Sequence, residues 1–341
     1  MRPVLSFSAP ANLLLMGEYA ITLEGGRGVS VAVEPRAVAT LTAAENIAYD
    51  QIPTILRERG GDGLLIIARM GAGDFKYTEN ATALHDAICA EFGLSGAAHT
   101  REDAPLRLEI DTTAFFDPDT GTKRGLGSSA VASLLATAAI GAILDSALEE
   151  APAEVIRRAI AVHRQMHEGR GSGYDVATSA LGGFVAFSGG AAPSARRLSP
   201  ASESDPRAVR LYSLATGKPV HSATAVRRFE EFVGPRERHR FLQKSNELAT
   251  AFETARRWCD LFMVVESARH LSEEIGETIG VGATLPFNSS HQDDGWIAKA
   301  SGAGNERAVV LAKADARRPL PTGAELLSIA RRGLAREDLT R

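Results

Sequence analysis

The bulk composition of the chain is that of an ordinary globular protein. Its 341 residues are 44% hydrophobic and 23% charged, which allows two domains and a sizeable core. The formal net charge of -4 excludes the broad basic field by which many proteins hold nucleic acid, so no nucleic-acid partner is expected.

Two further features of the sequence limit the class of protein to which the chain can belong. The two cysteines, Cys89 and Cys259, exclude a disulfide framework and a Cys-rich metal site, and they fit a reducing cytoplasm. No apolar run reaches the ~18 residues that span a bilayer. The N-terminal apolar stretch contains Asn12 and ends in Gly-Glu rather than in a cleavage site. We therefore expect a cytoplasmic protein without a membrane partner, either a monomer or a homodimer.

The first part of the chain predicts several strands and one helix, from the period of its apolar residues and its Gly and Pro positions. The predicted strands are residues 3–8 and 13–16, two strands within 28–45 that break at Pro35, 64–70 and 106–115, and the predicted helix is 80–94, ending near Gly93.

The rest of the chain mixes helices and strands. We predict helices at 128–144, from Pro152 to His167 and from Tyr174, strands at 183–190, 209–216 and 306–313, and two or three helices between 235 and 280. The absence of a regular βαβ order favours an α+β fold. The Pro-, Ser- and Arg-rich stretch 191–209 suggests a domain boundary, giving domains 1–195 and 196–341.

The stretch KRGLGSSA, residues 123–130, has the features of an anion site. Glycines let the backbone approach a ligand closely, and a helix N-terminus adds positive potential. Ser128 and Ser129 offer hydroxyl groups, while Lys123 and Arg124 add charge. The Walker spacing is absent, and a polar loop separates the glycines from the preceding strand, unlike in the Rossmann fingerprint. The pattern favours a polyphosphate site, with a plain helix N-cap as the alternative.

Two more glycine clusters follow. In GRGSGYD, residues 169–175, Asp175 opens a short helix, either as a simple cap or as a carboxylate beside a substrate hydroxyl. In KASGAGN, residues 299–305, Lys299 precedes a tight turn, which is also a common structural element.

Together with SAPANLLLMGEYA at residues 8–20, the three clusters stand in an order that resembles the GHMP kinases, the superfamily of galactokinase, homoserine kinase, mevalonate kinase and phosphomevalonate kinase. The resemblance covers roughly residues 6–312. It implies the GHMP kinase fold, with an N-terminal ribosomal-protein-like α+β domain, a C-terminal ferredoxin-like domain and an active site in the cleft between them.

The resemblance also implies a role for each motif, with ATP and Mg as cofactors and a small molecule as substrate. Asp175 and Lys123 become the catalytic candidates, and Ser129 and Glu168 the Mg-binding candidates. The residues implied to bind the nucleotide are Gly125, Leu126, Gly127, Ser128, Ser129 and Ala130. The residues implied to bind or support the substrate are Asn12, Glu18, Arg124, Arg170, Ser172, Gly173, Lys299, Ser301, Gly302, Ala303 and Gly304.

Within the superfamily the motifs look most like those of phosphomevalonate kinases, whose glycine loop reads Lys-Thr-Gly-Leu-Gly-Ser-Ser-Ala. A substrate that already carries a phosphate needs extra cations, and Lys123, Arg124, Arg170 and Lys299 stand at the motifs. Each of these cations alone is also compatible with solvated surface charge. The resemblance implies transfer of the γ-phosphoryl group of ATP to phosphomevalonate.

Three departures from the family pattern keep alternatives open. Asn12 stands where the family has the lysine of Pro-Gly-Lys, Asn305-Glu306-Arg307 replaces Gly-Gly-Asp, and the Mg-binding glutamate has no clear match besides Glu168. The alternatives are a mevalonate or sugar kinase and a catalytically weak protein that senses ATP and a metabolite. A decarboxylase of the superfamily is disfavoured because its Lys-Tyr-Trp-Gly-Lys pattern is absent.

Overall fold

The structure is a computed structural model, and it describes residues 1–69, 78–95, 104–199, 209–216, 222–288, 290–291, 295–304, 307–316 and 319–339. The chain forms two compact units, each built from separate segments. Unit 1 contains Met1–Ala11, Pro35–Gly182 and Arg332–Arg341, and unit 2 contains Asn12–Glu34 and Gly183–Arg331. These segments differ from a single boundary after residue 195, because the long strands β1 (Arg2–Met16) and β2 (Arg27–Ala43) contribute to both units.

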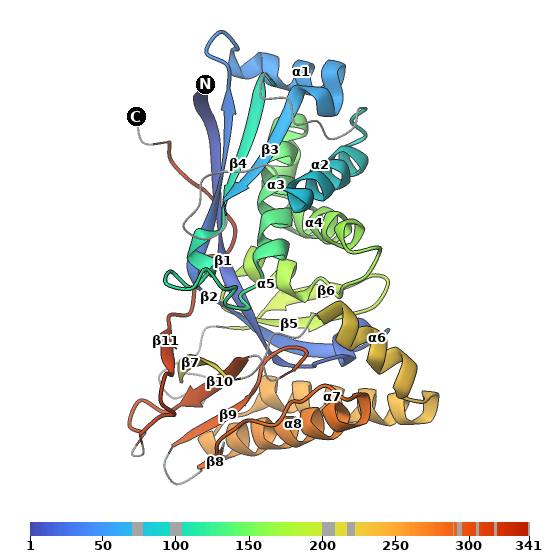
Figure 1. Ribbon diagram of the computed structural model, residues 1–341, viewed down its shortest axis with the longest axis vertical. Helices are drawn as coiled ribbons and strands as arrows, with labels where there is room; N and C mark the ends of the chain where they lie inside the picture. Colours follow the sequence, from blue (N-terminus) through green and yellow to red (C-terminus); the bar gives the residue numbers. More distant parts are fainter. Residues whose placement is uncertain are drawn as a thin grey trace. The chain divides into compact units, whose positions relative to one another are not determined.

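Unit 1 is a sheet with helices on one face (Figure 1). Its strand order is β12-β1-β2-β4-β3, in which β3 is parallel to β4, while β4 is antiparallel to β2 and β12 to β1. Besides β1 and β2, its elements are η2 (Tyr49–Gln51), α1 (Ile52–Arg59), η3 (Gly60–Gly63), β3 (Leu64–Arg69), α2 (Glu79–Phe92), β4 (Leu106–Asp111), η4 (Thr113–Phe115), α3 (Ser128–Leu144), η5 (Ser146–Glu150), α4 (Pro152–Met166), α5 (Tyr174–Leu181) and β12 (Ala335–Arg336).

Helix α3 is the core helix of unit 1. Its residues are apolar or small around the whole circumference, and nearly all are buried from Ala130 to Ile143. A helix that is apolar on every side has no face to offer water, so it packs between other elements. It contacts α4, α5 and the sheet strand β4. The expected α+β class is confirmed, and α3 has the predicted bounds.

Two strands continue where the sequence predicted breaks. Strand β2 passes through Pro35 without interruption, because it pairs with β5 over Arg27–Val31 and with β4 over Val38–Ala43. Pro35 lies between these two ladders, at a position that pairs with neither β5 nor β4. Strand β1 likewise runs as one strand from Arg2 to Met16.

Other element ends shift slightly from the prediction. Strand β4 stops at Asp111 because its Oδ1 accepts a hydrogen bond from the Thr113 N–H at 2.9 Å, and this local turn replaces the strand expected to reach residue 115. Helix α2 ends before Gly93, whose φ of 64° closes the helix as predicted. Helix α4 ends at Met166, one residue before the predicted end. Met70 of the predicted strand 64–70, residues 200–208 of the predicted boundary segment, and Asn305 and Glu306 lie outside the described residues.

Unit 2 contains a second, five-stranded sheet with the order β11-β7-β10-β9-β8, whose pairs are antiparallel. Its helices form an apolar cluster in which Tyr19 stacks on Phe229 at 5.2 Å between ring centroids. Its further elements are η1 (Ala20–Thr22), β5 (Phe184–Ser188), β6 (Ser194–Arg197), β7 (Arg210–Ala215), α6 (Ser222–Phe232), α7 (Pro235–Thr254), α8 (Trp258–Ile279), β8 (Ser290–His291), β9 (Trp296–Ala300), β10 (Arg307–Ala312) and β11 (Glu325–Leu327). Helix α6 was not predicted.

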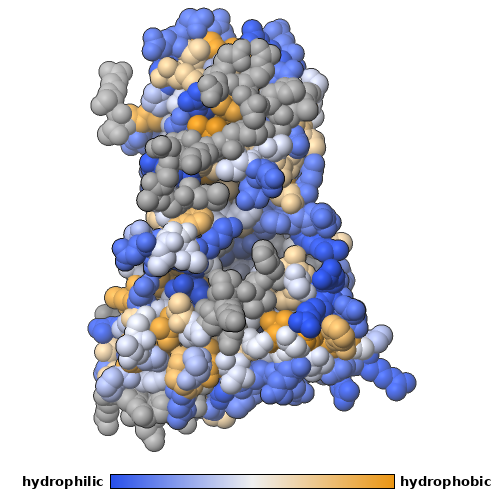
Figure 2. Space-filling model, in the orientation of Figure 1, coloured by the Kyte–Doolittle hydropathy of each residue, from blue (hydrophilic) through white to orange (hydrophobic). Residues whose placement is uncertain are grey.

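The surface is mixed in character. Within the described ranges, no helix combines the length and the apolar character that crossing a bilayer requires. The face in Figure 2 is largely hydrophilic, with hydrophobic side chains in separate places. Among large apolar side chains of the described residues, Phe232, Met263 and Leu326 are each more than half exposed. Such scattered side chains are normal for a folded protein.

Candidate functional site

The glycine turn of unit 1 leads directly into the N-terminus of α3. Gly125 and Gly127 both have positive φ, 64° and 79°, and Gly127 is the N-cap of the helix. Leu126 between them is buried and anchors the turn. No described side chain caps α3, and its first intrahelical bond runs from the Val131 N–H to the Gly127 carbonyl.

The consequence is an open donor site. The first amides of a helix have no partner within the helix, so those of Ser128, Ser129 and Ala130 can point at a ligand. An anion there also gains from the helix dipole. The residues predicted to hold nucleotide therefore occupy a turn and a helix end with suitable chemistry.

The second glycine cluster opens α5 in the same unit. Its N-cap is Gly173, with a φ of 88°, and a Cβ at this position would come within 2.8 Å of the Ile160 side chain. The left-handed backbone and the close approach both require glycine. Arg164 steadies the turn by donating to the carbonyls of Gly171 at 2.9 Å and Ser172 at 3.2 Å. This arrangement leaves half-buried Asp175 in the first turn of α5.

Two histidines that the sequence analysis did not single out lie beside the glycine turn. The Ser129 Oγ is 3.1 Å from the His167 Nε2, and the His163 ring packs edge-on against His167 with centroids 4.6 Å apart. The signal that could have found them is the pair in HRQMH, four residues apart, just before the GRGSG turn.

Charges from two predicted catalytic residues act on this ring. Partial burial lowers the pKa of His167 from its ordinary value; His163 and Lys123 lower it further, while Asp175 opposes the shift. In unit 1 the Ser129 hydroxyl therefore contacts this imidazole, and the charges of Asp175 and Lys123 act on its pKa.

The remaining predicted residues of unit 1 lie at the edges of these turns. Lys123 and Arg170 are exposed, and Arg124 is partly buried. The backbone N–H of Arg170 donates to the His167 carbonyl at 3.0 Å. Glu168 is exposed and has a φ of 57°, which is unusual for a residue other than glycine. Its predicted role as an Mg ligand stays a prediction.

In unit 2, Lys299 and Glu18 form a buried ion pair. The Lys299 side chain has no exposed surface and the Glu18 side chain is 6% exposed. The Lys299 ammonium also donates to the Ala300 carbonyl at 2.6 Å. Lys299 was predicted as a free cation for substrate; its charge is instead neutralised within the fold by Glu18, a partner 281 residues away in the sequence.

The chain around Glu18 and the chain around Lys299 are joined by two further hydrogen bonds. The Ser301 hydroxyl donates to the Leu14 carbonyl at 2.9 Å, and the Tyr19 hydroxyl donates to the Ala303 carbonyl at 3.0 Å. Burial, with a smaller effect of the Glu18 charge, raises the pKa of Tyr19, so its hydroxyl stays protonated and remains a donor. The part of the first motif from Asn12 onward and the third motif are thus one local structure within unit 2.

The other predicted residues of unit 2 fit this local structure. Asn12 is 2% exposed, within strand β1. Gly302 has a φ of 80° with open space where a Cβ would stand, and Gly304 is buried. The roles of these residues toward a substrate stay predictions.

The donor set of unit 1 fits a magnesium nucleotide. Backbone amides and the Ser129 hydroxyl suit phosphate oxygens, and hydroxyl and carboxylate oxygens suit Mg²⁺. In the part of the chain that the structure describes, no three His, Cys, Asp or Glu side chains form a metal-binding group. This is compatible with Mg²⁺, which usually keeps waters and is held by few carboxylates plus substrate phosphates.

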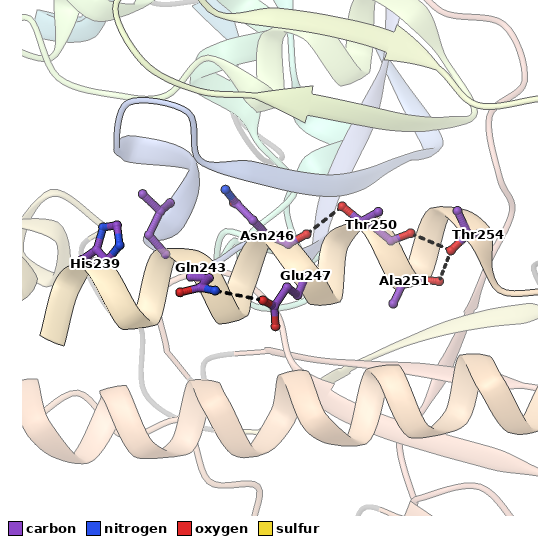
Figure 3. A pocket seen from close by; sticks show the side chains of 8 residues that line it. His239, Gln243, Asn246, Glu247, Thr250, Ala251 and Thr254 are labelled. Carbon is purple, nitrogen blue, oxygen red and sulfur yellow. Dashed lines mark hydrogen bonds between the residues drawn. The ribbon is translucent and has the colours of Figure 1, made fainter. Parts of the chain in front are cut away.

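An open groove of about 770 Å³ follows one face of α7 in unit 2 (Figure 3). Asn246 lies along it and is tied to the β1–β2 connection, accepting from the Arg27 N–H at 2.7 Å and donating to the Gly25 carbonyl at 3.0 Å. The side chains that line the groove are His239, Leu242, Gln243, Asn246, Glu247, Thr250, Ala251 and Thr254. None of the predicted site residues is among them.

Comparison with known proteins points to the same superfamily as the sequence motifs. Residues 81–183 match the family described as the GHMP kinases N terminal domain, a range that includes the glycine turn and Asp175. The chain is 25% identical to the phosphomevalonate kinase of Streptomyces sp. (strain CL190), with 92% of this chain and 91% of that protein covered.

Solved structures share the fold. The phosphomevalonate kinase of Streptococcus pneumoniae in complex with phosphomevalonate and AMPPNP is 18% identical with a TM-score of 0.66, covering 99% of this chain and 100% of that one. The L. major mevalonate kinase in complex with R-mevalonate is 15% identical with a TM-score of 0.62, covering 96% of both chains.

Proposed function

Residues 81–183 are a GHMP kinase N-terminal domain and the chain is a phosphotransferase of this type; on that premise we propose that it transfers the γ-phosphoryl group of ATP to phosphomevalonate. The products are diphosphomevalonate and ADP. The observation that carries the proposal is the uncapped N-terminus of α3 behind the Gly-Leu-Gly turn, with Lys123 and Arg124 just before it. The phosphomevalonate kinases among its relatives and fold neighbours support the choice of acceptor.

The nucleotide phosphates would be held mainly by backbone. The amides of Ser128, Ser129 and Ala130 donate to phosphate oxygens, and the helix dipole stabilises their charge. Mg²⁺, when bound with the Ser129 hydroxyl among its ligands, neutralises charge on the nucleotide phosphates. Phosphoryl transfer asks the protein chiefly for positioning and charge stabilisation, which this arrangement supplies.

Asp175 would orient the acceptor at the start of α5. An acceptor phosphate is already ionised near neutral pH, so its oxygen needs no strong base. This makes Asn12 tolerable where the family pattern has a lysine. Lys123, Arg124 and Arg170 would then supply the positive charge that a doubly phosphorylated product requires.

In unit 2 we assign a supporting role to the third motif. The bonds from Ser301 and Tyr19 and the pair between Lys299 and Glu18 hold the Ser-Gly-Ala-Gly turn against strand β1 and the turn after it. Lys299 therefore acts through the shape of this turn, while Asn12, Gly302 and Gly304 remain candidates for contact with the substrate.

The test is an ADP-release assay with Mg-ATP and, in parallel, phosphomevalonate, mevalonate, galactose and homoserine. Turnover with phosphomevalonate alone supports the proposal. Turnover with mevalonate or another unphosphorylated alcohol contradicts it and indicates that another group replaces the lysine missing at Asn12. ADP release with none of them, despite ATP binding, favours the metabolite sensor.

A variant pair tests the basis of acceptor choice. Lys123→Ala removes a cation beside the glycine turn, and Lys244→Ala removes one that is largely exposed on α7. We expect Lys123→Ala to raise the KM for phosphomevalonate roughly 10- to 100-fold, the range of a lost charge-assisted hydrogen bond, with little change in the KM for ATP. Lys244→Ala should leave both unchanged. Equal KM values in the two variants would contradict a role for Lys123 in binding the acceptor.

A further inference from the structure

The Ser129 hydroxyl has a defined partner from another helix. Ser129 is the second residue of α3, and His167 is the C-cap of α4. Their Oγ and Nε2 atoms lie 3.1 Å apart, within hydrogen-bond distance. The contact joins residues 38 positions apart in the sequence, so it depends on the packing of α3 against α4 rather than on the turn itself.

The ring of His167 is held in place from two directions. His163, one turn earlier on α4, is buried and meets it at an interplanar angle of 75°. After His167 the chain turns back at Glu168 and Gly169, both with positive φ, and the Gly169 N–H donates to the Arg164 carbonyl at 2.8 Å. His167 is exposed, and its contact with the buried His163 ring and the folded-back chain after it restrict where the imidazole lies beside the Ser129 hydroxyl.

An unrestrained serine in the first turn of a helix has other choices. Its χ1 has three staggered positions, and its hydroxyl can bond to nearby backbone groups instead of to a ligand. Ser133, one turn further along α3, takes such a local bond, donating to the Ser129 carbonyl at 3.0 Å. Ser129 makes its contact with His167 instead.

We propose that His167 is a positioning residue that holds the Ser129 hydroxyl in the rotamer that faces the magnesium–phosphate group of the bound nucleotide. The inference rests on the nucleotide site of the proposed function, and it is independent of which acceptor is phosphorylated. Residues that orient a metal ligand from outside typically change metal affinity by about 10- to 100-fold when they are removed.

The experiment measures ADP binding by calorimetry with Mg²⁺ and with EDTA, in His167→Leu, His167→Gln and Ser129→Ala. Leucine keeps the bulk of the ring without a hydrogen bond, and the glutamine amide can restore the bond. We expect His167→Leu to weaken binding about 10-fold in Mg²⁺ and to leave binding in EDTA unchanged. His167→Gln should recover most of the loss, and the exposed His239→Leu should behave as wild type.

Two further readouts separate positioning from a structural effect. Adding His167→Leu to Ser129→Ala should cost nothing more, because the hydroxyl to be positioned is already gone. In the ligand-free protein, Ser129→Ala should shift the imidazole nitrogen resonances of His167 in NMR spectra more than those of any other histidine. The unfolding midpoints of the single variants should stay close to wild type.

Several outcomes would overturn the inference: equal losses with Mg²⁺ and with EDTA, additive losses in the double variant, no recovery with glutamine, or wild-type protein that does not bind Mg-ADP. Failure of the proposed acceptor looks different. Wild type would then bind Mg-ADP and show the expected His167 effects, yet release no ADP with phosphomevalonate.

Discussion

Replacing Lys299 with methionine should destabilise unit 2 more than any comparable loss of a surface cation. Methionine keeps most of the length and apolar volume of the lysine stem and removes the charged ammonium, together with its hydrogen bond to the Ala300 carbonyl. The Glu18 carboxylate then remains almost fully buried, with 6% of its side chain exposed and its cation gone.

The magnitude follows from burial. Removing one partner of a buried ion pair costs about 3–5 kcal/mol, because the other charge is left without compensation. Lys313 and Asp315 provide a matched pair in the same unit, with nitrogen and oxygen 3.3 Å apart and side chains 43% and 74% exposed. Solvent screens such a pair, so Lys313→Met should cost about 0–1 kcal/mol.

Urea unfolding followed by tryptophan fluorescence measures the free energy of unfolding of unit 2. Both tryptophans, Trp258 and Trp296, lie in unit 2. A second variant, Glu18→Gln on the Lys299→Met background, removes the carboxylate charge that has lost its partner. It should recover about 1–3 kcal/mol of the free energy of unfolding. If Lys299→Met costs no more than Lys313→Met, or if the added glutamine deepens the loss, an uncompensated Glu18 charge is not what destabilises unit 2.

Three other predictions concern single positions. Because Asp175 is proposed to orient the acceptor, Asp175→Asn should lower kcat by about 100-fold while leaving the Kd for ATP nearly unchanged, and unchanged turnover would remove Asp175 from the mechanism. Gly173→Ala should lower the free energy of unfolding by about 2–4 kcal/mol, because the alanine would have a positive φ and would clash with the Ile160 side chain. Gly121→Ala is the control: it has a positive φ but open space around the new methyl group, and it should lower the free energy of unfolding by only about 1 kcal/mol. Equal losses in the two variants would show that the clash is absent. Burial raises the pKa of Cys89 to about 11, so at pH 8 only about 0.1% of this thiol is thiolate. In Cys259→Ser protein, Cys89 is the remaining thiol, and it should resist maleimide until urea unfolds the chain. In the folded protein, its slow rate of labelling should rise about tenfold per pH unit.

Local structure was largely readable from the sequence. The bounds of α3 and the start of α5 follow from glycine turns and from the apolar period, both of which act within a few residues. The prediction of an anion site at the glycine turn is equally local, because it depends on backbone amides and on the helix end. The sequence order of the motifs also indicated the GHMP kinases, which the family match and the fold neighbours support.

The tertiary structure decided what the polar residues contact. Lys299 looked like a free cation for substrate, yet strand pairing and packing place it against Glu18, and a buried charge is retained only with such a partner. His167 looked like the end of a helix, yet the packing of α3 on α4 sets it beside Ser129. Pro35 looked like a strand end, yet it falls between two ladders. Each of these depends on residues far apart in the chain, whose meeting no local pattern encodes.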